Sequence, residues 1–467
     1  MSAPSVPSVS TVPSAPAAPA EDRPAEAVTL PLGELHGSLA DPLLDAMTFL
    51  NEVTTRYPQA VSFAPGRPYE GFFEPEDVPV YLDAYLDHLA ASGLDRDAIR
   101  TTLFQYGPTK GIINDLVART LAHDENLTVA PEALVLTVGA QEGMLLALRA
   151  LCAGPQDVLL VSSPCYVGVT GAARLLDLTT VPVPEGPDGG PDPAAVRAAA
   201  REVRAAGRRP RALYVVPDFA NPSGTSMPVP ARARLLAAAA EEDLLVIEDN
   251  PYGFFARDAG ERPGERPTLK ALDRHRRVVY LGSFAKTCFP GARLGYVVAD
   301  QEVLGPGGRR TLLADELARL KSMTTVNTPA LSQAVIGGML LTHDCRLRAA
   351  NAPATAHYAA VMDVLLAELD RCFPAAERER LGLSWNVPEG GFFAVLTVAF
   401  AADDAAMERC AREFGVLWTP MTPFYPAGGG EHRLRLSISS LTPARVAAGV
   451  ARLADFIRTE TARGAAG

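Results

Sequence analysis

The sequence predicts an α/β fold in which a mainly parallel sheet carries helices on both faces. From about residue 75 onward, short apolar runs rich in valine and leucine alternate with helical stretches. Uninterrupted apolar runs of this length are typical of strands that are buried on both faces, as parallel strands are. Because parallel strands need long crossover connections, the helical stretches between the runs support the same fold class.

Six apolar runs are predicted as strands of this sheet. The first run is followed at once by the helical pattern QEGMLLALRALC. Farther along, Pro-Val-Pro at 228–230 opens the alanine-rich stretch ARARLLAAAAEED, and proline suits the first turn of a helix. The runs are ALVLTV (133–138), VLLVSS (158–163), ALYVVP (212–217), LLVIED (244–249), VVYLGS (278–283) and RLGYVVA (293–299).

Together with the regions on either side, this alternation predicts that the chain has four parts. Beyond about residue 345, a long helical pattern precedes GGFFAVLTV, FGVLWTP and RLRLSIS, and the helix ARVAAGVARLADFIR follows, an order typical of a small α+β domain. The first residues are rich in Pro, Ala and Ser, which predicts disorder. The expected parts are a disordered tail (1–28), a segment that joins the small domain (29–74), a large α/β domain (75–335) and the small C-terminal domain (336–467).

Composition and charge exclude several classes of protein. The chain has 467 residues and a net charge of −11, whereas a nucleic-acid binder normally shows a basic face. No stretch approaches the roughly 18 apolar residues of a membrane span, and the N-terminal tail lacks the features of a signal peptide. The six cysteines and seven histidines are scattered without the spacing of metal ligands. We expect a cytoplasmic enzyme that acts on small molecules and binds no metal, nucleic acid or membrane.

Three chemically distinct side chains follow the ends of predicted strands. They are Asn221 in PDFANPSG, Asp249 in VIEDNPY and Lys286 in SFAKT. In open α/β sheets, ligands bind beyond the carboxyl ends of the strands, so these groups are candidates for one site. Lys286 is one of only four lysines in an arginine-rich chain. A lysine amine in an apolar site can lose its proton and attack a carbonyl to form a Schiff base.

The neighbouring residues complete the inventory of a cofactor site. A carboxylate can pair with a pyridinium nitrogen, while an Asn amide and the phenol of Tyr252 can hydrogen-bond a ring oxygen. Ser283 and Arg293 flank Lys286 and can hold a phosphate, Arg by a two-pronged contact. An aldehyde to link, a nitrogen to pair, a hydroxyl to bond and a phosphate to anchor together describe pyridoxal 5'-phosphate.

The motif S-x-A-K-x-x-x-P-G-x-R-L-G-Y (283–296) closely resembles the lysine motif of the fold-type I, class I/II aminotransferases. The resemblance continues in the same order through nearly the whole chain after the tail. It implies a mainly parallel seven-stranded sheet with helices on both faces and a smaller α+β lobe. It also implies a pyridoxal phosphate cofactor on Lys286 and ping-pong transfer of an amino group between an L-amino acid and a 2-oxo acid.

Further site residues are implied by the resemblance. Tyr106 matches a tyrosine that reaches the phosphate of the neighbouring subunit's cofactor, which implies a homodimer with shared sites. Ala140 stands where the family commonly has Ser or Thr, so one hydroxyl contact to phosphate is expected to be missing. For the cofactor, the resemblance further implies Gln141 at the phosphate, Tyr166 stacked on the ring, and Asn221, Asp249 and Tyr252 around the ring. For the substrate, it implies Gly66 beside the carboxylate, Asn221, and Arg435 on the α-carboxylate.

Each assignment has a structural alternative. A lysine after a strand is usually a surface residue, and a carboxylate such as Asp249 can simply cap a turn. Because several motifs agree on one chemistry, the cofactor roles are favoured for both. Tyr106 and Tyr166 can instead be packing aromatics.

Two basic residues raise separate questions. One of Arg433 and Arg435 can be solvated, and strand alternation favours Arg435 as the inward residue if the flanking leucines face the opposite side. Lys110, in QYGPTKG, is interpreted as a solvated surface lysine, with a substrate or phosphate contact as the alternative.

Some stretches of the sequence resemble one subgroup of this family and so predict a substrate class. Stretches such as NEVTTRYPQAVSFAPGRPYEGFF and TLFQYGPTKGII are similar to the arylglycine aminotransferases of actinobacterial nonribosomal peptide pathways, which implies aromatic substrates and antibiotic biosynthesis. Several aromatic residues can line a side-chain pocket or serve as core and hinge residues: Tyr69, Phe72, Phe73, Phe392, Phe393, Phe424 and Tyr425. Three alternatives are an aromatic or 2-aminoadipate/kynurenine-type aminotransferase, a related enzyme with non-transaminase chemistry, and a transcription regulator with an aminotransferase-like domain. The acidic charge and the short N-terminal segment disfavour the regulator.

Overall fold

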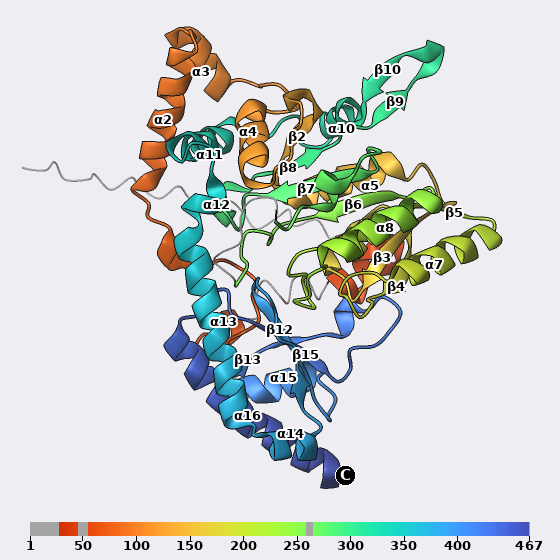
Figure 1. Ribbon diagram of the computed structural model, residues 1–467, viewed down its shortest axis with the longest axis vertical. Helices are drawn as coiled ribbons and strands as arrows, with labels where there is room; N and C mark the ends of the chain where they lie inside the picture. The colour runs from red at the N-terminus through yellow and green to blue at the C-terminus, as the bar shows by residue number, and fades with distance from the viewer. Residues whose placement is uncertain (1–27, 45–54, 258–264, 467) are drawn as a thin grey trace, which may run out of the picture. The chain divides into compact units, whose positions relative to one another are not determined.

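The computed structural model (Figure 1) describes residues 28–44, 55–257 and 265–466. The chain divides into two compact units, residues 1–41 and 42–467, which are described separately. The described part of the first unit contains two 3₁₀ helices, η1 (Leu32–Glu34) and η2 (Gly37–Ala40). The disordered tail is predicted for residues 1–28, of which residues 1–27 lie outside the described residues.

The second unit is built on a seven-stranded sheet with the order β2-β8-β7-β6-β5-β3-β4. The five strands from β7 to β4 run parallel, and β8 is antiparallel to both of its neighbours, β2 and β7. The strands are β2 (Leu134–Thr137), β3 (Asp157–Ser163), β4 (Thr179–Pro184), β5 (Arg209–Val215), β6 (Leu245–Asp249), β7 (Val278–Ser283) and β8 (Gly295–Val298). The predicted mainly parallel sheet is therefore confirmed.

One strand of this sheet was missed in the sequence. β4 carries Pro182 and Pro184 and is only partly buried, so it lacks the continuous apolar character of the other strands. It lies at the edge of the sheet beside β3, and an edge is where prolines are tolerated because one side of the strand needs no ladder hydrogen bonds.

Helices connect and cover these strands. The helices that lie wholly within the described residues of the second unit include α2 (Asp77–Ala91), α3 (Arg96–Phe104), α4 (Asn114–Asp124), α5 (Gly139–Leu151), α6 (Val167–Leu175), α7 (Pro193–Ala205), α8 (Val229–Glu241), α9 (Leu269–Leu272), α10 (Leu313–Lys321), α11 (Ala330–Thr342), α12 (Leu347–Ala350), α13 (Ala352–Cys372), α14 (Ala375–Leu381), α15 (Asp404–Arg409) and α16 (Pro443–Ala466). Among the described residues, no helix combines the length and the apolarity that crossing a membrane requires.

Alternate residues of the sheet face two different cores. Leu159 and Val161 of β3 pack in the cluster that contains α5 and α6, whereas Val158 and Leu160 pack with α7 and α8, which cover the opposite face (Figure 1). At the β2 end, Leu134 and its neighbours pack against α4 and α11. Burial on both faces explains why these strands are apolar at every position.

A smaller antiparallel sheet forms in the C-terminal part with the order β11-β12-β15-β14. Its strands are β11 (Ser384–Trp385), β12 (Phe393–Thr397), β14 (Thr419–Pro420) and β15 (Arg433–Ser437). The long helices α13 and α16 contact each other beside it. Separate pairs are β1 (Val61–Ser62) with β13 (Val416–Leu417), and β9 (Glu302–Leu304) with β10 (Arg310–Leu312). The boundaries at residues 75 and 336 stay predictions.

Candidate active site

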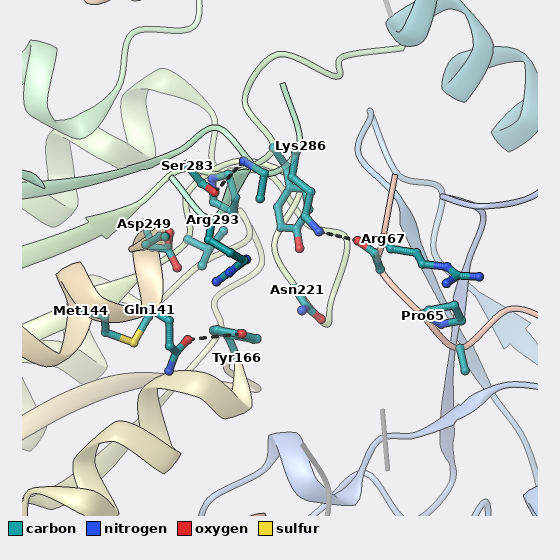
Figure 2. Close-up of a pocket in the computed structure, with 18 of the residues that line it drawn as sticks. Pro65, Arg67, Gln141, Met144, Tyr166, Asn221, Asp249, Ser283, Lys286 and Arg293 are labelled. Atoms are coloured by element: carbon teal, nitrogen blue, oxygen red, sulfur yellow. Dashed lines mark hydrogen bonds between the residues drawn. The ribbon is translucent and has the colours of Figure 1, made fainter. Parts of the chain in front are cut away.

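A cavity of about 460 Å³ lies beyond the carboxyl ends of the parallel strands (Figure 2). Asn221 follows β5, Asp249 ends β6 and Lys286 follows β7, so three neighbouring strands deliver their polar groups to one place. Every site residue proposed from the sequence lines this cavity except Tyr106. The lining includes Gly66, Ala140, Gln141, Tyr166, Asn221, Asp249, Tyr252, Ser283, Lys286, Arg293 and Arg435.

Lys286 points its amine into the cavity, where Nζ donates a 2.6 Å hydrogen bond to the carbonyl oxygen of Gly66 (Figure 2). Burial disfavours the ammonium form and lowers the pKa of Lys286 to about 8, with repulsion from Arg293 and Arg435 acting in the same direction. A lysine whose pKa lies close to neutral is available as a nucleophile and as a proton acceptor.

Asp249 is buried at the end of β6. Its Oδ2 accepts a 2.6 Å hydrogen bond from the hydroxyl of Tyr214, and its Oδ1 has no hydrogen-bond partner. Burial raises the pKa of Asp249 to about 6, and the hydrogen bond from Tyr214 opposes this shift. A buried carboxylate oxygen without a partner is rare in folded proteins and points to a donor supplied by a ligand.

Another part of the cavity wall is suited to an anion. Helix α5 begins at Gly139, and the first backbone amides of a helix attract negative charge. Gly139 has φ of +73°, and a Cβ there would lie 2.6 Å from a guanidinium nitrogen of Arg293, so only glycine lets the arginine approach. Arg293 itself has φ of +47°, a conformation that few side chains adopt, and Ser283 lies beside it on the cavity wall (Figure 2).

A second cationic group lies on the side of the smaller sheet. Arg435 of β15 is 2% exposed, while Arg433 is exposed. The guanidinium of Arg435 donates to Asn221 Oδ1 at 2.5 Å and to the carbonyl oxygen of Ala64 at 2.7 Å, and its Nε has no partner. Burial lowers the pKa of Arg435 to about 10. The group is therefore a buried cation whose donors are only partly used.

The aromatic residues proposed for a side-chain pocket do not line the cavity. None of Tyr69, Phe72, Phe73, Phe392, Phe393, Phe424 and Tyr425 is among the residues that line the described cavity. Phe392 and Phe393 are buried and contact Tyr252 edge-on, with ring centroids 5.4 and 5.6 Å away. The interpretation as core residues therefore holds for these, and Tyr166 and Tyr252 are the aromatic rings of the cavity wall.

Two predicted candidates lie outside the cavity. Tyr106 is 85% exposed. Lys110 is not a freely solvated lysine, because its Nζ bonds Asp315 Oδ1 at 2.6 Å and the carbonyl oxygen of Glu132 at 2.7 Å. Its amine is thus engaged in holding α10 to the segment before β2.

Sequence reasoning missed several residues at the site. Thr55, Arg67 and Met144 also line the cavity, and Tyr214 supports Asp249 from β5. The signal for Tyr214 was present, since ALYVVP carries one phenol in an otherwise apolar run. Glu142, in the first turns of α5, was missed too; it accepts from the backbone N of Val138 and pairs with the buried Lys321 at 2.9 Å.

Comparison with known proteins decides the family. Residues 80–453 match the family model of the aminotransferases of class I and II. The chain belongs to this family. The enzyme depends on pyridoxal phosphate and moves an amino group between an amino acid and a 2-oxo acid.

Three relatives show how far the similarity extends. The aminotransferase is 50% identical to (S)-3,5-dihydroxyphenylglycine transaminase of Amycolatopsis orientalis, over 92% of this chain and 94% of that one. It is 31% identical to 2-aminoadipate transaminase of Thermus thermophilus, over 86% and 91% of the two chains. A crystal structure of α-aminoadipate aminotransferase from Thermus thermophilus, complexed with N-(5'-phosphopyridoxyl)-L-leucine, matches with a TM-score of 0.70 at 29% identity and covers 92% of this chain and 100% of that one.

The residues present fit pyridoxal phosphate. The unpaired Oδ1 of Asp249 offers an acceptor for the ring N–H, and the start of α5 with Ser283 and Arg293 offers donors for the phosphate. Lys286 reaches the same cavity with an amine of lowered pKa. The fold implied by the resemblance, a mainly parallel seven-stranded sheet with a smaller α+β lobe, is confirmed for this aminotransferase.

Proposed function

We propose that this aminotransferase converts an arylglyoxylate into the corresponding L-arylglycine, with an L-amino acid as the amino donor. The observation that carries the proposal is the 50% identity, over 92% of the chain, to an enzyme named for (S)-3,5-dihydroxyphenylglycine. The identity to the 2-aminoadipate transaminase is much lower, at 31%. A substrate class is more often shared at the higher of these two identities.

In the proposed mechanism the cavity residues divide between cofactor and substrate. When bound, pyridoxal phosphate supplies an aldehyde that condenses with amines and a ring that accepts the electron pair left when Cα loses its proton. Asp249 would hold the ring nitrogen in its protonated form, and Asn221 and Tyr252 would hydrogen-bond the ring hydroxyl. Tyr166 would lie against the ring. The phosphate would be held by Ser283, Arg293, Ala140 and Gln141, the last two at the amide end of α5.

Lys286 and Arg435 act on the substrate itself. Arg435 binds the α-carboxylate through its guanidinium N–H groups. In the described structure these groups donate to Asn221 Oδ1 and to the carbonyl oxygen of Ala64. Gly66 also lines the cavity. The Nζ of Lys286, with its pKa near 8, takes the proton from Cα. General acid–base catalysis is most efficient when the pKa of the catalytic group is close to the working pH. In an arylglycine, Cβ is a ring carbon that carries no leaving group, so removal of the Cα proton cannot lead to β-elimination.

A panel of acceptors tests the substrate class. We expect kcat/KM for phenylglyoxylate and 3,5-dihydroxyphenylglyoxylate to exceed that for phenylpyruvate by about 10–200-fold, because one methylene changes transition-state binding by that factor in a fitted pocket. The measurement is a coupled assay with each acceptor against a set of L-amino donors. Phenylpyruvate as the better acceptor would contradict the arylglyoxylate assignment while leaving the aminotransferase activity intact.

A second candidate is 2-aminoadipate/kynurenine-type activity. It is favoured by the 31% identity to 2-aminoadipate transaminase over 86% of the chain. The same panel decides between the two candidates, because 2-oxoadipate carries a second carboxylate in place of the aryl ring. Preference for 2-oxoadipate would replace the first proposal, and appearance of a product without nitrogen transfer would favour non-transaminase chemistry.

We also propose a cytoplasmic homodimer in which Tyr106 serves the partner's site. Large apolar side chains are exposed near this residue and on a neighbouring loop: Phe104 is 70%, Tyr106 85% and Met323 83% exposed. The two loops are adjacent, because a Cβ on Gly107 would lie 3.9 Å from the side-chain nitrogen of Asn327. Exposed apolar groups of this kind mark interfaces. All six cysteines are free thiols, as is usual in a reducing compartment.

Mixed dimers test the shared site. Tyr106→Ala and Lys286→Ala are each expected to impair activity, the first through a cofactor affinity about tenfold lower, since a hydrogen bond to a charged group is lost. When the two variants are refolded together, the hybrid dimer contains one site with both Lys286 and Tyr106. At a cofactor concentration too low to saturate Tyr106→Ala, the mixture should therefore be more active than the sum of the two variants. A mixture no more active than the sum of its parts, or a fully active monomer in sedimentation, would contradict the proposal.

A further inference from the structure

Tyr214 lies where it can control the carboxylate of Asp249. It is completely buried in β5, and its residue pairs in the parallel ladder with Ile247 of β6. Asp249 lies two residues beyond Ile247 and therefore on the same face of the sheet. The phenol reaches diagonally across the two strands, and its oxygen is 2.6 Å from Asp249 Oδ2.

This contact divides the two oxygens of the carboxylate between protein and cavity. Oδ2 is held by Tyr214, whereas Oδ1 has no partner although Asp249 lines the cavity. When one oxygen of a carboxylate is held by a hydrogen bond, the rotation of the group is restricted and the second oxygen remains a free acceptor. A pyridine ring offers a single N–H, so one free oxygen is what it requires.

We propose that Tyr214 is a positioning residue that orients Asp249 toward the ring nitrogen of pyridoxal phosphate and keeps its carboxylate ionised. The inference rests on the proposed role of Asp249. Tyr214 is not among the residues that line the cavity, so we expect it to act on the cofactor only through Asp249.

The charges around Asp249 make this hydrogen bond important. Tyr166 and Tyr252 also line the cavity, and burial raises the pKa of both phenols, which keeps them neutral. Lys286 and Arg293 line the same cavity. Burial raises the pKa of Asp249, and the contribution of Tyr214 is the one that lowers it. Without the phenol hydroxyl, the carboxylate would hold its proton to a higher pH and pair less well with the ring nitrogen.

The test measures binding of pyridoxamine 5'-phosphate to the apoenzyme across a range of pH. This probe keeps the ring nitrogen and the phosphate but has an amine where the aldehyde would link to Lys286, so affinity is read without covalent chemistry. For the wild type, affinity is expected to fall as Asp249 gains its proton near pH 6. In Tyr214→Phe, we expect the midpoint of this fall to move upward by about one pH unit and the affinity near neutral pH to drop about tenfold.

Two further variants separate positioning from general damage. Tyr85→Phe also removes a buried phenol that hydrogen-bonds, to the carbonyl oxygen of Ile112 at 3.1 Å, and is expected to leave the profile unchanged. In the Asp249→Asn background, Tyr214→Phe should cost little further affinity, because the group through which Tyr214 acts is already altered. A uniform loss of affinity without a shifted midpoint, or full additivity with Asp249→Asn, would overturn the proposal. If Asp249→Asn alone leaves the affinity for pyridoxamine 5'-phosphate unchanged, the proposed role of Asp249 is itself contradicted.

Discussion

Replacing Lys286 with alanine is expected to lower kcat/KM by at least about 10⁴-fold, the largest effect of any single change in this chain. The substitution removes both the amine that links to the cofactor and the base that moves the Cα proton, and no other lysine lines the described cavity. The measurement is steady-state transamination together with the visible absorption spectrum of the purified enzyme. The spectrum of the variant should match free or loosely held cofactor rather than lysine-linked cofactor.

Two controls sharpen this result. Lys110→Ala removes an amine that is bound to Asp315 and Glu132 outside the cavity, so activity should stay within about twofold of the wild type. Added small primary amines should partly restore proton transfer in Lys286→Ala, because the missing group is itself a primary amine. Wild-type turnover by Lys286→Ala would contradict the assignment, whatever the substrate proves to be.

Replacing Asp249 with asparagine is expected to lower kcat/KM by about 10²–10⁴-fold. Loss of one partner of a buried charged pair costs about 3–5 kcal/mol, and here the loss falls where the ring nitrogen must stay protonated. Asparagine keeps the size of the side chain, so the fold should be retained. The measurement combines kcat/KM with the affinity for pyridoxamine 5'-phosphate, and both should fall.

A carboxylate outside the cavity provides the matched control for this second substitution. Asp315→Asn changes a group that pairs with Lys110, and it should leave kcat/KM nearly unchanged. Equal activity of Asp249→Asn and the wild type would mean that the unpaired Oδ1 does not face the ring nitrogen, and the proposed arrangement of the cofactor would then be wrong.

The sequence predicted the strands whose apolar character depends on burial at every residue. β3, β5, β6 and β7 lie within the interior of the sheet and could be recognised from valine and leucine alone. β4 could not, because an edge strand is only partly buried and tolerates the prolines that usually argue against a strand. The antiparallel direction of β8 also leaves no mark in its composition, since its residues are as buried as those of parallel strands.

At the candidate site, too, some residues could be found from the sequence and others could not. Asn221, Asp249 and Lys286 could be found in the sequence because each stands at the end of a recognisable strand or a few residues beyond it, and parallel strands bring their carboxyl ends together. Tyr214 was missed because its contact with Asp249 joins residues 35 positions apart across two strands. The aromatic residues near Gly66 and in the C-terminal part could not be assigned from sequence, because core and cavity positions favour the same apolar rings.

The order of residues alone shows which chemical groups this protein carries near its strand ends: one of its four lysines, a carboxylate, an amide, and a serine and an arginine that flank the lysine. The environment of each group becomes visible only in the folded chain. The amine of Lys286 is lowered in pKa by burial, one oxygen of Asp249 is taken by Tyr214 while the other is left free, and Lys110 is held away from the cavity by Asp315. The physical reason is that desolvation and hydrogen bonding depend on which surfaces meet in space, and those surfaces come from segments far apart in the chain.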